Sequence, residues 1–319
     1  MRRLIGEHTG VPSGPLVIVF GATHGNEPAG VLAIQEVLNM LAIEPRVNPG
    51  FQFAGKFVGL IGNLQAYLSG QRFLKSDLNR QWTTENIDRI QHEPKGLEAE
   101  DAEISELLDL IHAEIRQNKP EALIFLDLHT TSAEGGIFCI PTDDESSLRL
   151  AKTLHAPVIL GLFEGIEGTL LNYATSGNHF QVDGYPKHTL GAAFESGQHE
   201  DPLSVSRAIS AIISCLRACG CIRAEDVDNK HDAILKKYSD QLPKVTRLRY
   251  VHKIRPEDAF EMRPGYINFQ AIRQNEHLAD DITGPIYAPR NGLILMPLYQ
   301  SKGSDGFFIV EPLEDAQGV

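Results

Sequence analysis

The chain of 319 residues predicts an α/β fold, in which a doubly wound sheet with helices on both faces precedes a small β domain. Short apolar runs, typical of strands covered on both faces, alternate with amphipathic helical segments along the first two thirds of the chain. The last third is rich in glycine, proline and β-branched residues, which favours strands and turns. The length itself suggests more than one core.

Each predicted element follows from a local pattern. Residues 15–20 form an apolar run that ends at Gly21, and apolar residues then recur at helical spacing over 28–41. The longest amphipathic segment, 99–117, places five apolar side chains on one helix face. Further strands are expected at 51–62, 122–128, 136–140, 157–162 and 190–194, and further helices at 63–69, 146–155 and 202–219.

The character of the chain changes after residue 224. Residues 225–244 are polar, charged and weakly helical, which is typical of a connector. Turn-forming tracts such as Arg263-Pro264-Gly265 then separate stretches of residues that favour β-strands. We therefore expect a catalytic α/β domain over 1–224, a connector over 225–244 and a small β domain over 245–319.

Composition and charge exclude several classes of protein. An apolar fraction of 42% with 22% charged residues is typical of a folded, soluble chain. The net charge of -13 argues against a nucleic-acid partner, and no stretch of about 18 apolar residues predicts a membrane span. With no signal peptide recognised, we expect a cytoplasmic location. Homo-oligomerisation is left open.

The four cysteines give no recognisable metal site. They are Cys139, Cys215, Cys219 and Cys221. The last three have a C-x3-C-x-C spacing that does not match common zinc arrangements. We interpret all four as reduced thiols without a function.

Two clusters of metal-binding side chains follow predicted strands. The tract 21–28 (GATHGNEP) puts His24 and Glu27 three residues apart, and His129 follows the strand 122–128. Two histidines and one glutamate are the protein ligands of many catalytic zinc sites, which keep a further position for water. Ligands of doubly wound sheets bind at the carboxyl ends of strands, and Asp127 could orient one of these ligands. On spacing alone, ordinary loop residues remain an alternative.

Two further tracts carry charged groups. Arg72, Asn79 and Arg80 lie within nine residues, and their side chains could clamp a carboxylate or polarise a carbonyl. Glu195 follows the apolar strand 190–194. From these residues alone, a solvated loop with surface ion pairs and an exposed loop glutamate are the simpler explanations.

Together the four clusters resemble the succinylglutamate desuccinylase and aspartoacylase family, a branch of the zinc carboxypeptidase-like hydrolases. The resemblance is carried by HGNE (24–27), DLNR (77–80) and DLHT (127–130), in the family's order and at about its spacing. It covers most of residues 15–319, including the small C-terminal β domain. It implies a doubly wound mixed sheet like that of the zinc carboxypeptidases.

The resemblance also implies a metal centre. One zinc ion per subunit would be held by His24, Glu27 and His129. Glu195 falls at the position of the family's general base, which activates the zinc-bound water and then protonates the departing amine.

The resemblance further implies how a substrate is bound. Arg72 would polarise the scissile carbonyl and stabilise the oxyanion. Asn79 and Arg80 would hold the α-carboxylate of a small carboxylated substrate. Tyr299 would close over that substrate from the C-terminal domain.

One position departs from the family's pattern. About ten residues before the catalytic glutamate, family members with known substrates carry an arginine that grips the acidic side chain or acyl group. Here Tyr185 stands at that position, followed by Pro186, Lys187 and His188. Either Lys187 or His188 replaces the arginine, or the substrate has no second carboxylate. The resemblance therefore does not extend to N-acetylaspartate or succinylglutamate as the substrate.

The sequence thus predicts a zinc-dependent hydrolase that cleaves the amide bond of an N-acyl amino acid or a similar small carboxylated molecule. Two alternatives stay open. A metallocarboxypeptidase would use the same clamp, because a peptide C-terminus also has a carboxylate beside the scissile amide. A non-catalytic sensor of a metal or a carboxylated metabolite would need the ligands but neither Glu195 nor Arg72.

Overall fold

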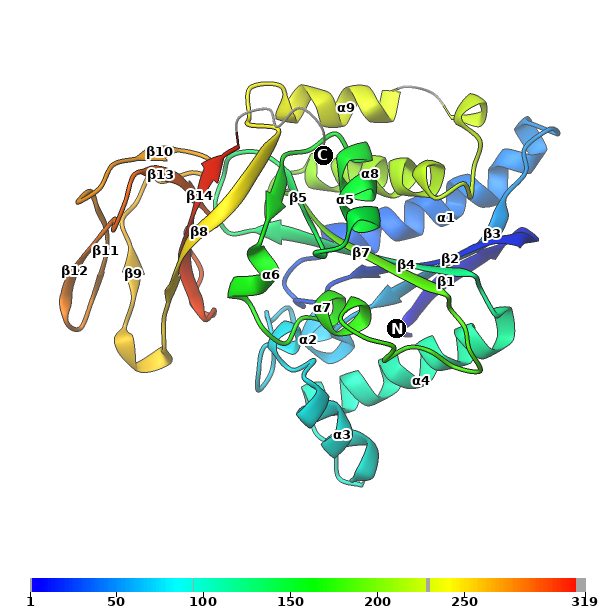
Figure 1. Cartoon of the computed structure of the whole chain (residues 1–319), viewed down its shortest axis with the longest axis horizontal. Coiled ribbons are helices and arrows are strands. Elements are labelled where there is room, and N and C mark those ends of the chain that lie inside the picture. Colours follow the sequence, from blue (N-terminus) through cyan, green and yellow to red (C-terminus); the bar gives the residue numbers. More distant parts are fainter. Residues whose placement is uncertain (1, 94, 228–229, 314–319) are drawn as a thin grey trace.

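The computed structural model describes residues 2–93, 95–227 and 230–313. Within these residues a mixed sheet of eleven strands has the order β1-β3-β2-β4-β7-β5-β6-β8-β14-β13-β10. Its centre is formed by four mutually parallel strands, β3 (Ala54–Ile61), β2 (Val11–Gly21), β4 (Ala122–Thr131) and β7 (His188–Gln198). The predicted fold class, a mixed sheet with helices on both faces, is confirmed (Figure 1).

The other strands extend this sheet or form a smaller one. The large sheet also contains β1 (Leu4–Thr9), β5 (Phe138–Pro141), β6 (Val158–Leu160), β8 (Val245–Lys253), β10 (Ala271–Ile272), β13 (Gly292–Leu295) and β14 (Asp305–Pro312). The small sheet consists of β9 (Glu261–Met262), β11 (His277–Asp281) and β12 (Gly284–Tyr287). Strands β1 and β5 run antiparallel to their neighbours β3 and β7, which makes the sheet mixed.

Helices cover both faces of the central strands (Figure 1). One face carries α1 (Ala29–Val47), α5 (Glu145–Thr153), α8 (Ser204–Ala218) and α9 (Lys230–Ser239). The other carries α2 (Leu64–Ser69), α3 (Thr84–His92), α4 (Glu100–Asn118), α6 (Leu162–Gly165) and α7 (Leu170–Thr175). Short 3-10 turns occur at η1 (Leu78–Arg80), η2 (Ala224–Asp226) and η3 (Pro256–Asp258).

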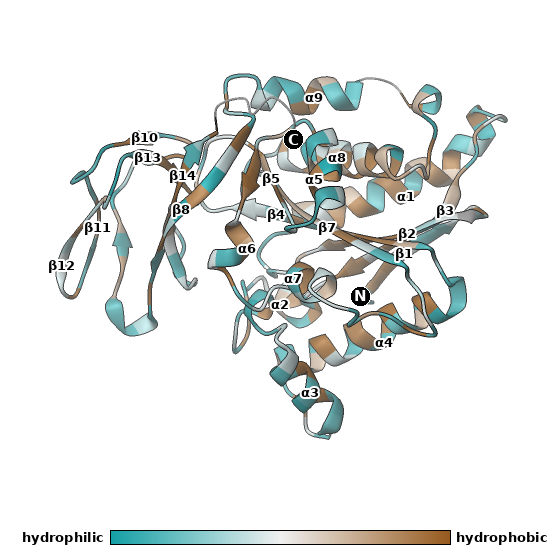
Figure 2. Ribbon diagram, viewed as in Figure 1, coloured by the Kyte–Doolittle hydropathy of each residue, from teal (hydrophilic) through white to brown (hydrophobic). Residues whose placement is uncertain are grey.

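The core has two layers because each central strand is buried on both faces. In β2, Leu16, Ile18 and Phe20 join the layer under α4, whereas Val17 and Val19 join the layer under α1 and α8. Figure 2 shows the corresponding apolar colouring of the central strands and the polar outer faces of the helices. Burial on both faces explains why these strands read as continuous apolar runs.

Several elements differ from the sequence prediction. Strands β4 and β7 extend past their apolar runs, so that His129 and Glu195 lie inside strands rather than in the loops after them. The reason is that the polar residues at these strand ends are buried and continue the hydrogen-bonded ladder. Helix α1 also continues beyond residue 41, with Pro45 in its last turns. The elements β1, α3, α6 and α7 were not predicted.

Four of the strands from Val245 onward, β8, β10, β13 and β14, continue the large sheet, because β8 pairs in parallel with β6. The connector contains α9, whose Leu235 is fully buried. The division into 1–224, 225–244 and 245–319 stays a prediction, and residues 314–319 lie outside the described part. Among the described helices, none combines the length and apolar character that a membrane crossing requires.

Glu100, a buried carboxylate of α4, holds the loop that carries Arg72. Glu100 accepts hydrogen bonds from the backbone N–H groups of Leu74, Lys75 and Ser76, at 2.7, 3.1 and 3.1 Å. It also accepts one from Asn63 Nδ2 at 3.1 Å. These bonds satisfy the part-buried N–H groups of the loop, and they fix the loop that runs from Arg72 to η1.

Replacing Glu100 by alanine should therefore destabilise the protein by about 3 kcal/mol, because three part-buried backbone N–H groups and the buried amide of Asn63 lose their acceptor. Urea unfolding at neutral pH measures this change. Glu98→Ala is the matched control, since Glu98 is an exposed glutamate two residues earlier. Equal unfolding midpoints for the two variants would contradict the assigned role of Glu100.

Candidate active site

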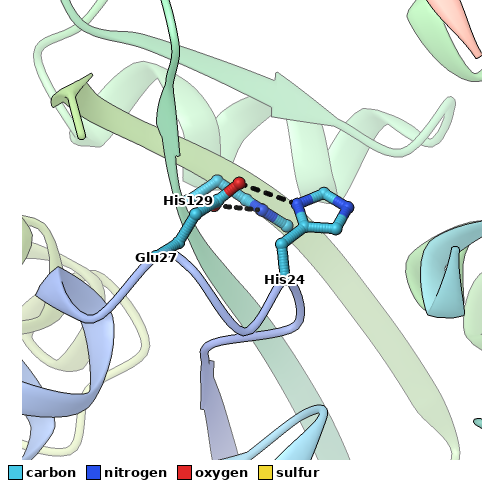
Figure 3. A group of neighbouring side chains, drawn as sticks. All are labelled: His24, Glu27 and His129. Atoms are coloured by element: carbon cyan, nitrogen blue, oxygen red, sulfur yellow. Dashed lines mark hydrogen bonds and ion pairs between the residues drawn. The ribbon is translucent and has the colours of Figure 1, made fainter. Parts of the chain in front are cut away.

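Three potential metal ligands converge where β2 and β4 end. His24 and Glu27 come from the turn between β2 and α1, and His129 lies in β4. Nδ1 of His24 lies 2.8 Å from Glu27 Oε1, and Nδ1 of His129 lies 3.1 Å from Glu27 Oε2. Figure 3 shows the Glu27 carboxylate between the two rings. The three side chains are buried, and their ligand atoms lie within 4.8 Å of one another, so this group could hold a metal ion.

A close backbone contact shapes the turn that carries His24 and Glu27. A Cβ atom at Gly25 would lie 2.2 Å from the carbonyl carbon of Ala66 in α2, so only glycine fits there. The N–H of Gly25 also donates to the carbonyl oxygen of Arg72, at 2.9 Å. The turn after β2 and the loop of Arg72 are thereby fixed to each other.

Two aspartates orient the two histidine ligands. Asp127 Oδ2 lies 2.9 Å from Nε2 of His129, and Thr23 donates to the other oxygen of Asp127 at 2.7 Å. Asp77 Oδ1 lies 3.2 Å from Nε2 of His24. Both rings therefore turn Nδ1 toward Glu27, in the carboxylate–histidine arrangement common around protein-bound metals. The expectation that Asp127 lies behind a ligand agrees with this geometry.

The opposite charges of this cluster shift the pKa values of its members. Burial raises the pKa of Glu27, but the adjacent His24 and His129 outweigh burial and hold it well below its usual range. Burial lowers the pKa of His129, whereas Asp127 and Glu27 together raise it well above its usual range. The buried Asp77 keeps a pKa well below normal because His24 and Arg72 lie beside it. Glu27 and Asp77 are thus ionised near neutral pH.

Glu195 faces the same cluster from the neighbouring strand. It lies directly opposite His129 in the ladder between β4 and β7, and it is only 7% exposed. Its Oε2 atom is buried and has no hydrogen-bond partner among the described residues. Burial raises the pKa of Glu195 to about 7. Such a carboxyl group can both take up and release a proton near neutral pH.

Arg72 reaches the ligand cluster from the loop after α2. Its Nη2 atom lies 2.9 Å from Nε2 of His24 and 3.2 Å from Asp77 Oδ2, and its Nη1 atom lies 3.4 Å from Glu27 Oε1. The structure therefore brings Arg72 together with two of the potential ligands. From this position the guanidinium group can stabilise negative charge that develops beside a metal.

Asn79 and Arg80 lie at the edge of the cluster, in η1. Asn79 Oδ1 accepts the backbone N–H of Leu170 at 3.1 Å. Nη2 of Arg80 donates to Asp305 Oδ2 at 2.6 Å, and Lys253 Nζ lies 2.7 Å from Asp305 Oδ1. The C-terminal strands β8 and β14 thus hold the guanidinium group of Arg80 in place.

These residues line one cavity of about 110 Å³. Its walls include every proposed ligand and the polar residues Glu195, Arg72, Asn79 and Arg80. A cavity well below the 300–1,000 Å³ of drug-sized pockets suits a small molecule. Residues 296–305 contribute several side chains to the wall and bound the cavity on the C-terminal side.

Tyr299 does not line this cavity. It is 39% exposed, and its hydroxyl donates to the carbonyl oxygen of Arg263 and accepts the N–H of Tyr266. The adjacent Gln300 lines the cavity instead and accepts a hydrogen bond from Asn26 at 3.1 Å. The hydroxyl of Tyr299 is thus used within the C-terminal segment, and the structure does not bring it to a substrate.

The structure also shows site residues that the sequence prediction missed. His199 lies one residue after β7, and its Nδ1 atom is 2.7 Å from the hydroxyl of Thr130. Its place in a polar tract four residues after Glu195 is a signal that could have identified it. Asp305 and Gln300 had no such signal, because they are far from the motifs in sequence. The cavity-lining residues of α6 read as ordinary core positions.

The residues at and after the position of the family's arginine do not line the cavity. Tyr185 pairs with Val182 through backbone hydrogen bonds, and Lys187 Nζ lies 4.8 Å from the centre of its ring. Lys187 and His188 line a separate depression, together with Gly177. Neither residue therefore supplies the missing cation to the cavity.

Comparison with known proteins supports the resemblance. The sequence profile of the succinylglutamate desuccinylase/aspartoacylase catalytic domain matches residues 13–182. A probable aspartoacylase of Nostoc sp. is 28% identical over 124 residues, which cover 39% of this chain and 38% of that protein. A second from Acaryochloris marina is 28% identical over 151 residues, which are 45% of each chain. The chain thus spans less than half the length of the curated relatives it matches.

Solved structures share the fold at low sequence identity. A succinylglutamate desuccinylase/aspartoacylase from Rhodobacter sphaeroides has a TM-score of 0.65 and 17% identity, covering 97% of this chain and 88% of that one. The product-bound ectoine utilization protein EutE (DoeB) from Ruegeria pomeroyi has a TM-score of 0.64 and 16% identity, covering 96% and 87%. Because the family profile matches more than half of its length, the chain belongs to the succinylglutamate desuccinylase/aspartoacylase family.

Proposed function

We propose that the protein is a zinc-dependent hydrolase that cleaves the amide bond of an N-acyl amino acid or a similar small carboxylated substrate. One observation carries the proposal. Two imidazoles and a carboxylate converge within 4.8 Å, directly opposite the buried and unpartnered carboxyl group of Glu195. Membership of the family supports the same chemistry.

The donor set fits zinc. Two neutral imidazole nitrogens with one carboxylate oxygen are the ligands of several catalytic zinc sites. When bound, zinc would act as a Lewis acid toward a carbonyl oxygen and lower the pKa of a coordinated water. The aspartates behind both rings also fit, because ligating histidines usually have such partners.

Glu195 would act as the general base and then as the general acid. As a carboxylate it would remove a proton from the attacking water, and as a carboxylic acid it would deliver that proton to the leaving amine. Its pKa of about 7 makes both forms available at neutral pH. Its buried, unpartnered oxygen leaves it free to bond to water rather than to the protein.

The arginines would bind the rest of the substrate. Arg72 would stabilise the oxyanion that forms at the scissile carbonyl. Arg80 and Asn79 would hold the α-carboxylate, and the ion pair with Asp305 keeps the Arg80 side chain in one orientation. The size of the cavity favours a small substrate over the C-terminus of a long peptide.

A panel of N-acetyl, N-succinyl and N-formyl amino acids tests this function. We expect release of the free amine, loss of activity after zinc chelation and recovery when zinc is added back. A tetrapeptide in the same assay tests for carboxypeptidase activity. Zinc that binds without turnover of any panel member would instead favour a sensor, and turnover unaffected by chelation would refute the proposal.

Glu195→Gln should lower turnover by at least about 100-fold, because the amide can neither accept nor deliver the proton. Zinc content by elemental analysis should stay at the wild-type level, since Glu195 is not among the three ligands. Glu200→Gln, at an exposed position five residues later, is the matched control and should keep normal turnover. Near wild-type turnover in Glu195→Gln would show that another group is the base.

In the metal-free protein, Glu195 should make stability depend on pH. Its pKa rises from an ordinary 4.5 to about 7 on folding, so the unfolded chain ionises first as the pH increases. The wild type should thus lose about 1–3 kcal/mol relative to Glu195→Gln between pH 5 and pH 8, with little further change above that. Urea unfolding of both chelated proteins at several pH values measures the difference. A difference that is independent of pH would contradict the raised pKa.

A further inference from the structure

One wall of the cavity is apolar. It consists of side chains from β5, β7 and the segment around α6, together with residues of the C-terminal strands and loops. These side chains are Ile140, Leu162, Phe163, Ile166, Ala193, Met296, Leu298 and Phe308. Figure 1 places α6 between the central strands and β8. Most of the apolar wall thus belongs to the hydrophobic core next to the site, and Met296 packs against that core.

The apolar wall lies next to the residues proposed to hold the α-carboxylate. Leu170 N donates to Asn79 Oδ1, and the N–H of Trp82 donates to the carbonyl oxygen of Gly168 at 3.0 Å. A Cβ atom at Gly168 would lie 2.4 Å from the carbonyl oxygen of Arg80, so the two segments touch at backbone distance. In an N-acyl amino acid, the α side chain is attached to the same carbon as the carboxylate. The wall beside Asn79 and Arg80 is therefore where that side chain lies.

The cavity offers no spare cation to an acidic side chain. Among the described residues that line it, Arg72 and Arg80 are the lysine or arginine side chains, and the proposed function already uses Arg72 for the oxyanion and Arg80 for the α-carboxylate. Three carboxyl groups, Glu27, Glu195 and Asp305, line the same cavity. A substrate carboxylate against this wall would be desolvated without a counter-charge, which is strongly unfavourable.

A cationic side chain of the substrate would also lack a free acidic partner beside Arg80. Asp305 is an acidic group beside the Arg80 clamp, but Arg80 and Lys253 occupy one oxygen each, at 2.6 and 2.7 Å. A substrate ammonium group would have to displace one of these two ion pairs. The apolar wall presents hydrocarbon groups to the cavity, so it favours contact with an apolar side chain of the substrate.

We infer that the substrate is an N-acyl derivative of an amino acid with an uncharged, apolar side chain. That side chain packs on Leu162, Phe163 and Ile166 while Arg80 and Asn79 hold the α-carboxylate. The inference rests on the proposed hydrolase function and specifies its substrate class.

The first test varies the amino acid and keeps the acetyl group fixed. Zinc-loaded protein is assayed with N-acetyl derivatives of leucine, methionine, aspartate, glutamate and lysine. We expect kcat/KM for the leucine and methionine compounds to exceed that for the charged ones by at least about 100-fold. A preference for aspartate, glutamate or lysine would overturn the inference but leave the hydrolase function intact.

A second series keeps leucine and changes the acyl group from formyl to acetyl to hexanoyl. If the apolar wall receives the α side chain, kcat/KM should respond to the amino acid more strongly than to the acyl chain. A steep preference for hexanoyl with indifference to the amino acid would place the acyl group against the wall and overturn the assignment.

Variants of the wall test the contact directly. Ile166→Ala should lower kcat/KM for N-acetyl-leucine by about 10-fold, mainly through KM, because it removes hydrocarbon contact. Ile166→Arg should shift the preference toward N-acetylaspartate by supplying a cation. Leu203→Ala, at an exposed leucine outside the cavity, is the control and should leave both substrates unaffected. Unchanged selectivity in folded Ile166 variants would overturn the inference.

Calorimetric binding separates failure of the inference from failure of the proposed function. Zinc-loaded Glu195→Gln protein is titrated with N-acetyl-leucine and with N-acetylaspartate. Tighter binding of the leucine compound supports the apolar wall even if the wild type hydrolyses no compound, in which case only the hydrolase function fails. Tighter binding of the aspartate compound, or binding of neither, overturns the inference.

Discussion

The site depends on one constraint, the parallel alignment of β2, β4 and β7. Their hydrogen-bonded register places His129 opposite Glu195, and it brings Gly21, just before the turn of His24, beside Leu128. Successive residues of a strand point to opposite faces, so a shift of one residue between β4 and β7 would put these two side chains on different faces of the sheet. The backbone ladder therefore determines which charged groups meet.

That ladder forces several ionisable groups into a buried space, and the protein balances their charges locally. Glu27 lies between two imidazoles, and each imidazole has an aspartate behind it. Glu195 lacks such a counter-group, and its buried Oε2 atom has no hydrogen-bond partner among the described residues. A buried carboxyl oxygen without a partner, beside a cluster of potential metal ligands, is typical of a site that is built to bind something.

The sequence predicted those helices and strands whose hydrophobic pattern lies within one short stretch of the chain. Apolar runs identified β2 and the first parts of β4 and β7, because both faces of these strands are buried. The strand ends were missed, since the polar residues there point into a buried site rather than to solvent. The short α6 was missed as well, because four helical residues leave no periodic pattern.

The candidate site was predictable to a similar extent. The tracts around His24, Asn79 and His129 are compact motifs, so resemblance alone could assign them roles. Asp305 could not be found in this way, because its contact with Arg80 joins residues from distant parts of the chain. Tyr299 and Gln300 differ by one position, and only the path of the folded chain decides which of them faces the cavity.

The contact between Arg80 and Asp305 spans 225 residues of sequence. During synthesis from the N-terminus, the ligands, Glu195 and both arginines leave the ribosome well before β14 does. The nascent chain can thus form the central sheet before the C-terminal residues complete the cavity. At that stage Arg80 has no contact with Asp305. Because contacts of such large sequence separation form late, the cavity is completed in a late stage of folding.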